Sequence, residues 1–92
     1  MTSRLTSVRF TPARTGGGLL GWASFVLDGD VRVDGLAVRR TLHGELTCSW
    51  PGRRGAGGRL HHHVWPIDDA ARLRLEGELL AHLHPFLRGS AA

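Results

Sequence analysis

The glycine-rich segment SWPGRRGAGGRLHHHVWP, residues 49–66, gathers side chains that could bind a ligand. It carries Arg53, Arg54 and Arg59, together with four glycines and three consecutive histidines. A guanidinium group can bind two phosphate oxygens at once, and glycines let the backbone approach a ligand closely. The segment therefore predicts an anion-binding hairpin tip, at which the three arginines lie near one another and contact phosphates.

A metal site is a second chemistry that this part of the chain could support. Cysteine and histidine are the usual zinc ligands, and the candidates are Cys48, His61, His63, His82 and His84. In a strand, His61 and His63 share a face, but two ligands on one face do not complete a site. His82 and His84 are two residues apart on a helix and so lie on different faces. The pattern favours a solvated strand face over a metal site, and no metal is expected.

Catalysis finds less support in the residue pattern. Cys48 alternates with Leu46 and Trp50 on one face of a strand, where a buried thiol is the usual occupant. Asp68 and Asp69 are explained by capping of the helix that follows. No nucleophile, base and orienting group occur together, and the glycines lack the lysine and hydroxyl residue of a phosphate-binding loop. We therefore expect no enzyme activity, no cofactor and no small-molecule substrate.

The charge of the chain favours an anionic partner. The 92 residues carry a formal net charge of +4, and all twelve basic residues are arginines. Such a balance on a small surface favours nucleic acid first. We expect DNA rather than RNA as the partner, but the charge itself does not distinguish the two. Arg39, Arg40 and Arg72 are further candidate contacts, and Trp50 or Trp65 could stack on bases if exposed. The alternative is a merely soluble basic protein whose arginines are solvated and whose tryptophans are buried.

Length and apolar pattern limit the class of protein. A chain of this length makes one domain with a marginal core, so pairing of two copies would help it. The hydrophobic fraction is 41%, and no apolar run reaches the roughly 18 residues that cross a bilayer. The first ten residues lack the apolar core of a signal peptide, and one cysteine excludes an internal disulfide framework. These features predict a cytoplasmic protein.

The elements that must position the candidate residues are strands followed by a helix. Alternating or β-rich runs predict strands at about residues 4–12, 19–27, 31–40, 45–50 and 60–65. Asp28-Gly29 predicts a hairpin turn, and Asp34-Gly35 predicts a bend in the next strand. The period changes over residues 67–83, which predict a helix ended by Pro85, and its apolar stripe comprises Leu75, Leu79, Leu80 and Leu83. The expected fold is α+β, with four to five antiparallel strands and a C-terminal helix on one face.

Three segments of the chain, WASFVLDGDVRVDGLAV, LTCSWPGRR and WPIDDAARLRLEGELL, together resemble the stage V sporulation protein G (septation protein SpoVG) family. The segment WASFVLDGDVRVDGLAV looks like the second and third strands of the family, with a Leu-Asp turn between them. LTCSWPGRR is similar to its strand that ends before two basic residues, here Arg53 and Arg54. WPIDDAARLRLEGELL resembles its Pro-Ile, cap and helix. The resemblance covers roughly residues 4–83 and predicts a single domain over residues 1–92, with a core of about 4–84 and a tail of 85–92.

The resemblance implies a small homodimer with an antiparallel sheet and a C-terminal helix. It also implies site-selective binding of nucleic acid, and modulation of transcription, septation during cell division, or sporulation. A protein-interaction module without direct nucleic-acid contact is the alternative, and a metal-responsive binder that uses the histidines is a third possibility. The target sequence and the regulated process do not follow from the residues.

Overall fold

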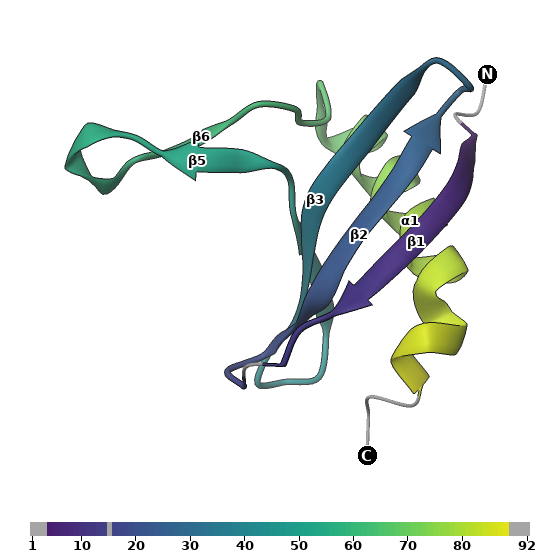
Figure 1. Cartoon of the computed structure of the whole chain (residues 1–92), viewed down its shortest axis with the longest axis horizontal. Helices are drawn as coiled ribbons and strands as arrows, with labels where there is room; N and C mark the ends of the chain where they lie inside the picture. Colours follow the sequence, from purple (N-terminus) through teal and green to yellow (C-terminus); the bar gives the residue numbers. More distant parts are fainter. Residues whose placement is uncertain (1–3, 15, 89–92) are drawn as a thin grey trace.

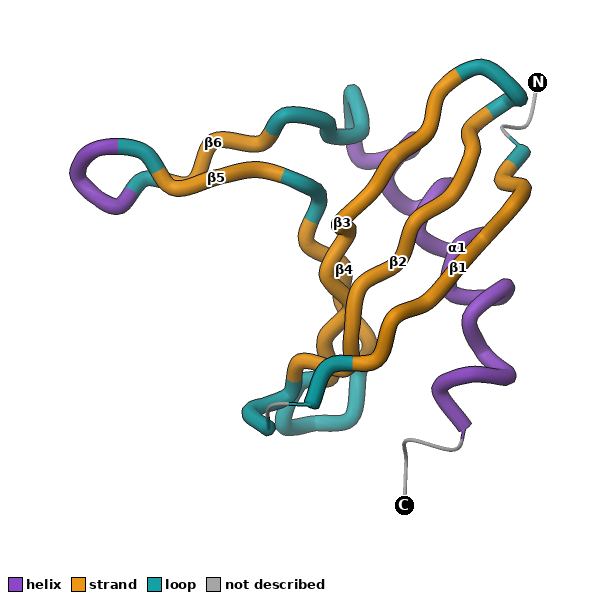
Figure 2. The backbone as a smooth tube through the Cα atoms, viewed as in Figure 1, coloured by secondary structure: helices purple, strands orange, loops and turns teal. Residues whose placement is uncertain are grey.

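The computed structural model describes residues 4–14 and 16–88 and has an α+β architecture (Figure 1). The elements are β1 (Leu5–Pro12), β2 (Leu19–Leu27), β3 (Val31–Arg40), β4 (Leu46–Ser49), β5 (Gly52–Arg54), the 3-10 turn η1 (Ala56–Gly58), β6 (Leu60–His62) and α1 (Asp69–Arg88). Strands β1 to β4 form an antiparallel sheet in sequence order, and β5 and β6 form a separate pair (Figure 2). The expected fold class is confirmed.

Glycines fix the two predicted irregularities of the β2–β3 hairpin. Asp28 and Gly29 both have positive φ, 54° and 77°, and the Asp30 amide donates to the Leu27 carbonyl at 3.1 Å. This is the type I′ turn that Asp-Gly favours between twisted strands. The register between β2 and β3 shifts near Gly35, whose φ is 80°, so β3 bulges there. Both expectations are confirmed.

Helix α1 covers one face of the four-stranded sheet and closes the core. Asp68 caps its first turn, because its Oδ1 accepts a hydrogen bond from the Ala71 amide at 2.8 Å. The buried positions of the helix recur every four residues and are Ala71, Leu75, Leu79, Leu83 and Leu87. The four leucines pack in one cluster with Phe25, Leu36 and Val38 of the sheet. The predicted stripe is confirmed, with Leu80 partly buried at its edge.

The helix continues through Pro85, so the prediction that it ends there is wrong. Proline removes the backbone donor to the preceding turn and costs about 3 kcal/mol inside a helix. Packing on both sides of the proline offsets this cost, since Leu83 is 0% and Leu87 3% exposed. Phe86 also packs against Phe10 of β1, with ring centroids 6.4 Å apart. The core therefore extends beyond residue 84, and residues 89–92 of the predicted tail lie outside the described part.

The opposite face of the sheet, which we call the open face, is not covered by α1 (Figure 1). One row of cross-strand neighbours on it runs from Thr11 through Trp22 and Ala37 to Ser49. Trp22 is 41% exposed there, whereas its chain neighbours Gly21 and Ala23 are buried. The open face thus exposes a tryptophan of β2 between polar residues of the two outer strands. Among the described helices, none is both long and apolar enough to cross a membrane.

Candidate functional site

Residues 52–62 form an arm that projects away from the four-stranded sheet (Figure 2). Strands β5 and β6 pair antiparallel and are joined through η1. The Gly55 amide donates to the Arg59 carbonyl at 2.7 Å and closes the tip. Gly57 and Gly58 both have a φ of 79°, which residues with side chains rarely adopt. The glycine-rich sequence therefore forms the tip of a hairpin, as predicted.

At the base of the arm, the backbone of β5 lies close to the backbone of β6. A Cβ at Gly52 would lie 2.4 Å from the His61 carbonyl oxygen, so only glycine fits the pairing of β5 with β6. The His63 amide donates to the Pro51 carbonyl at 2.7 Å. His62 Nδ1 lies 2.8 Å from the Trp50 carbonyl oxygen, and because a carbonyl only accepts, Nδ1 carries the proton. These contacts set the direction in which the arm leaves the sheet.

Strand alternation separates the two adjacent arginines of the arm. Arg53 pairs with His61, and Arg54 pairs with Leu60. Because successive side chains of a strand point to opposite faces, Arg53 and Arg54 lie on opposite faces of the arm. Arg54 Nη1 also donates to the Gly58 carbonyl at 2.8 Å, which holds its side chain toward the tip. The three predicted arginines share the arm, but they do not all share one surface.

One face of the arm and the open face of the sheet enclose a cleft, which we call the arginine cleft. Its volume is about 450 Å³, and its lining includes Ala37, Arg39, Ser49, Gly52, Arg54 and Leu60. Arg39 comes from the sheet and Arg54 from the arm, so the fold joins two predicted site residues that are distant in sequence. None of the described residues that line the cleft is acidic. The arginine cleft is therefore a positively charged groove between two surfaces.

The remaining predicted site residues lie elsewhere. Arg59 follows η1 at the exposed tip of the arm. Arg40 lies at the end of β3, where its Nη1 is 3.5 Å from the Gly44 carbonyl oxygen. Arg53 faces away from the cleft, and Arg72 lies in the first turns of α1. Two of the six candidates, Arg39 and Arg54, therefore line the cleft. Arg59 belongs to the same arm but does not line the cleft.

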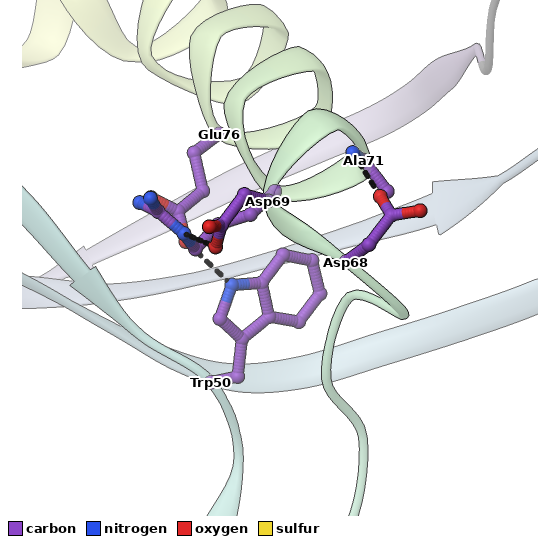
Figure 3. Close-up of polar contacts among 6 residues, drawn as sticks. Trp50, Asp68, Asp69, Ala71 and Glu76 are labelled. Atoms are coloured by element: carbon purple, nitrogen blue, oxygen red, sulfur yellow. Dashed lines mark hydrogen bonds and ion pairs between the residues drawn. The ribbon is translucent and has the colours of Figure 1, made fainter.

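Arg72 forms ion pairs with two carboxylates of its own helix. Its Nη1 is 3.7 Å from Glu76 Oε1, and its Nε is 3.7 Å from Asp69 Oδ1. Glu76 in turn accepts a hydrogen bond from Trp50 Nε1 at 2.7 Å (Figure 3). A phosphate at Arg72 would meet two negative charges, so this position is poorly suited to an anion. Sequence periodicity did not predict these ion pairs.

The two candidate stacking residues have different environments. Trp50 is 8% exposed and packs edge-on against Phe25, with ring centroids 6.1 Å apart. Trp65, in the segment between β6 and α1, is 63% exposed. A planar base can reach an indole face only where that face is accessible. Trp65 is therefore available for stacking, and Trp50 is a core residue.

Cys48 is a structural thiol on the covered face of the sheet. It packs against the hydrophobic core. Burial, with a smaller contribution from the negative charge of Glu76, raises the pKa of the Cys48 thiol to about 12. The thiolate is the nucleophilic form, so the folded protein presents very little of it at neutral pH. Among the described residues, no three histidine, cysteine or acidic side chains gather as metal ligands.

We expect the Cys48 thiol to react with iodoacetamide at pH 8 about 100- to 1,000-fold more slowly in the folded protein than in guanidinium chloride, because the raised pKa suppresses the thiolate. Cys48 is the only cysteine, so mass spectrometry of the intact chain follows one site. Equal rates in the folded and unfolded states would show that the thiol is accessible and ionised in the fold.

The arrangement is suited to binding an anion. Two guanidinium groups can contact phosphate oxygens in the arginine cleft, and the glycines at its rim leave the backbone accessible. The described lining contains no acid or base paired with a nucleophile. No family model matches the sequence, and no curated protein matches it significantly.

Proposed function

We propose that this protein binds nucleic acid by holding backbone phosphates in the arginine cleft. The observation that carries the proposal is the convergence of Arg39 and Arg54 on one open groove whose described lining has no acidic residue. Arginine forks fit phosphate oxygens, and the net charge of +4 attracts a polyanion from a distance. Phosphate contacts position the ligand, while selectivity between sequences needs additional contacts to bases or to shape.

The resemblance to the SpoVG family extends the proposal to a biological role. On this basis the proposed role is regulatory: site-selective binding of nucleic acid modulates transcription, septation or sporulation. The proposed location is the cytoplasm, and the proposed ligand is DNA rather than RNA. The basic pair that carries the resemblance, Arg53 and Arg54, occupies β5 of the arm. The proposal needs no cofactor, no metal and no catalytic residue.

Binding of nucleic acid is tested by gel shift with double-stranded DNA, single-stranded DNA and RNA at two salt concentrations. We expect binding that weakens steeply between about 50 and 200 mM salt, because each neutralised phosphate releases counterions. The measurement is the slope of log affinity against log salt for each ligand. Affinity that is absent for all three ligands at low salt would refute the proposal.

A protein-interaction module is the second candidate function. Exposed apolar side chains between β6 and α1 favour it: Val64 is 39%, Trp65 63% and Ile67 89% exposed. Such apolar surface can contact a protein partner in division or regulation. A protein interface depends less steeply on salt than phosphate binding does, so the same salt series separates the two functions.

The proposed assembly is a two-fold homodimer, which would present two arms to one ligand. The helix covers only one face of the sheet, so the open face or a sheet edge remains for a second copy. Light scattering at micromolar concentration is expected to report about 20 kDa, twice the 10.0 kDa of one chain. A mass of one chain at every concentration would contradict the dimer.

A further inference from the structure

A second hollow lies beside the arginine cleft, at the junction of the arm with the segment that leads to α1. We call it the indole pocket, because Trp65 forms part of its wall together with Leu60, His61 and His62. Its volume is about 320 Å³, which is within the range of sites for small ligands. Leu60 lines both this pocket and the arginine cleft, so the two hollows are neighbours on the arm.

The side chains of the indole pocket suit a flat, partly polar ring. Trp65 and Leu60 are 63% and 45% exposed and provide apolar surface. His61 and His62 complete the lining. The contact of His62 Nδ1 with the Trp50 carbonyl leaves the Nε2 atom of that ring for another partner. A nucleobase has this chemistry, with an apolar face for stacking and a polar edge for hydrogen bonds.

We propose that the indole pocket takes a base of single-stranded nucleic acid, stacked on Trp65, while a phosphate of the same strand lies in the arginine cleft. This inference rests on the proposed function and specifies its ligand. In a duplex, both faces of a base are covered by its neighbours and its polar edge is paired, so the pocket cannot be filled without unstacking. The protein then prefers single strands to duplexes of the same length.

The test compares two oligonucleotides that carry the same phosphates. One is a thymidine oligomer of ten residues, and the other is an abasic oligomer of equal length. We expect the wild-type protein to bind the thymidine oligomer more tightly, by about 5- to 150-fold, which is the usual contribution of one stacked base. Trp65→Ala should remove this difference and bind both oligomers as the wild type binds the abasic one. Trp65→Phe should retain part of the difference, because an aromatic face remains.

Ile67→Ala is the matched control, because Ile67 is 89% exposed, lies two residues from Trp65 and does not line the pocket. It should bind both oligomers as the wild type does. Tryptophan fluorescence gives a second readout: the thymidine oligomer should quench the wild-type signal, and Trp65→Ala should lose that quenching. Circular dichroism verifies that each variant is folded.

Three outcomes would overturn the inference. One is equal affinity of the wild-type protein for the thymidine and abasic oligomers, with a steep salt dependence for both. That result would agree with phosphate binding as the function but would show that no base binds in the indole pocket. A thymidine preference that persists in folded Trp65→Ala would place the stacking elsewhere. If light scattering showed that Trp65→Ala changes the mass of the assembly in solution, the pocket would instead be a contact surface for a second copy of the chain. Absence of binding to either oligomer would instead refute the proposed function itself.

Discussion

Replacing Leu79 by alanine is expected to lower the free energy of unfolding by about 2–5 kcal/mol. Leu79 is 1% exposed and packs in the cluster that joins α1 to the sheet. The substitution removes buried methyl groups and leaves a cavity that the surrounding strands fill only in part. For a domain of this size, such a loss is a large share of the total stability. The measurement is the midpoint and slope of denaturation in urea.

Leu73→Ala is the matched control for this prediction. Leu73 belongs to the same helix and is the same residue type, but it is 66% exposed. Its replacement should change the free energy of unfolding by no more than about 0.5 kcal/mol. If Leu79→Ala and Leu73→Ala unfolded at the same urea concentration as the wild type, the helix would not pack through the face that carries Leu79.

Replacing Arg39 and Arg54 together by glutamine is expected to weaken nucleic-acid binding for all sequences alike. Each arginine would neutralise one phosphate, so the slope of log affinity against log salt should fall in magnitude by about 2. Both residues lie at the surface, and the described core does not include them. The variant should therefore keep the melting temperature of the wild type. Fluorescence anisotropy over a salt series measures the slope.

Arg53 and Arg74 supply the matched control, since their joint replacement by glutamine removes the same charge. Arg53 faces away from the arginine cleft, and Arg74 is an exposed residue of α1. We expect this variant to keep a steeper salt slope than the cleft variant. Equal losses in the two variants would mean that total charge, rather than the cleft, determines binding. Unchanged binding in a folded cleft variant would exclude Arg39 and Arg54 as contacts.

Local signals in the sequence predicted much of the fold correctly. Asp28-Gly29 specified its own turn, and Gly35 specified its own bulge, because both depend on backbone conformations that few residues adopt. The stripe of Leu75, Leu79 and Leu83 specified which face of the helix is buried, because helical spacing places these residues together. In each case the information lies within a few consecutive residues.

Features that depend on tertiary contacts were not predictable in the same way. Pro85 locally disfavours a helix, but the packing of Leu83 and Leu87 outweighs that preference. Strands β5 and β6 form a sheet separate from the main one. The alternation of side chains along a strand could not predict this, because the alternation would be the same in either sheet. Strand alternation alone places Arg53 and Arg54 on opposite faces, but the arginine cleft joins residues that are distant in the sequence and could not be read from a local pattern.

The separate pairing of the arm has a consequence for how the protein could change during evolution. The ladder of β5 with β6 is a sheet of its own, so the arm can lengthen without altering the pairing of the other four strands. Side chains alternate between the two faces of a strand. Two residues added to each strand would therefore leave every later side chain on its present face of the arm, whereas one added residue would move it to the opposite face. A single insertion on each side, between Gly52 and Arg53 and between His61 and His62, would therefore turn Arg54 to the other side of the ribbon. Natural variation in arm length is thus expected to add or remove an even number of residues in each strand, because side chains alternate between the two faces.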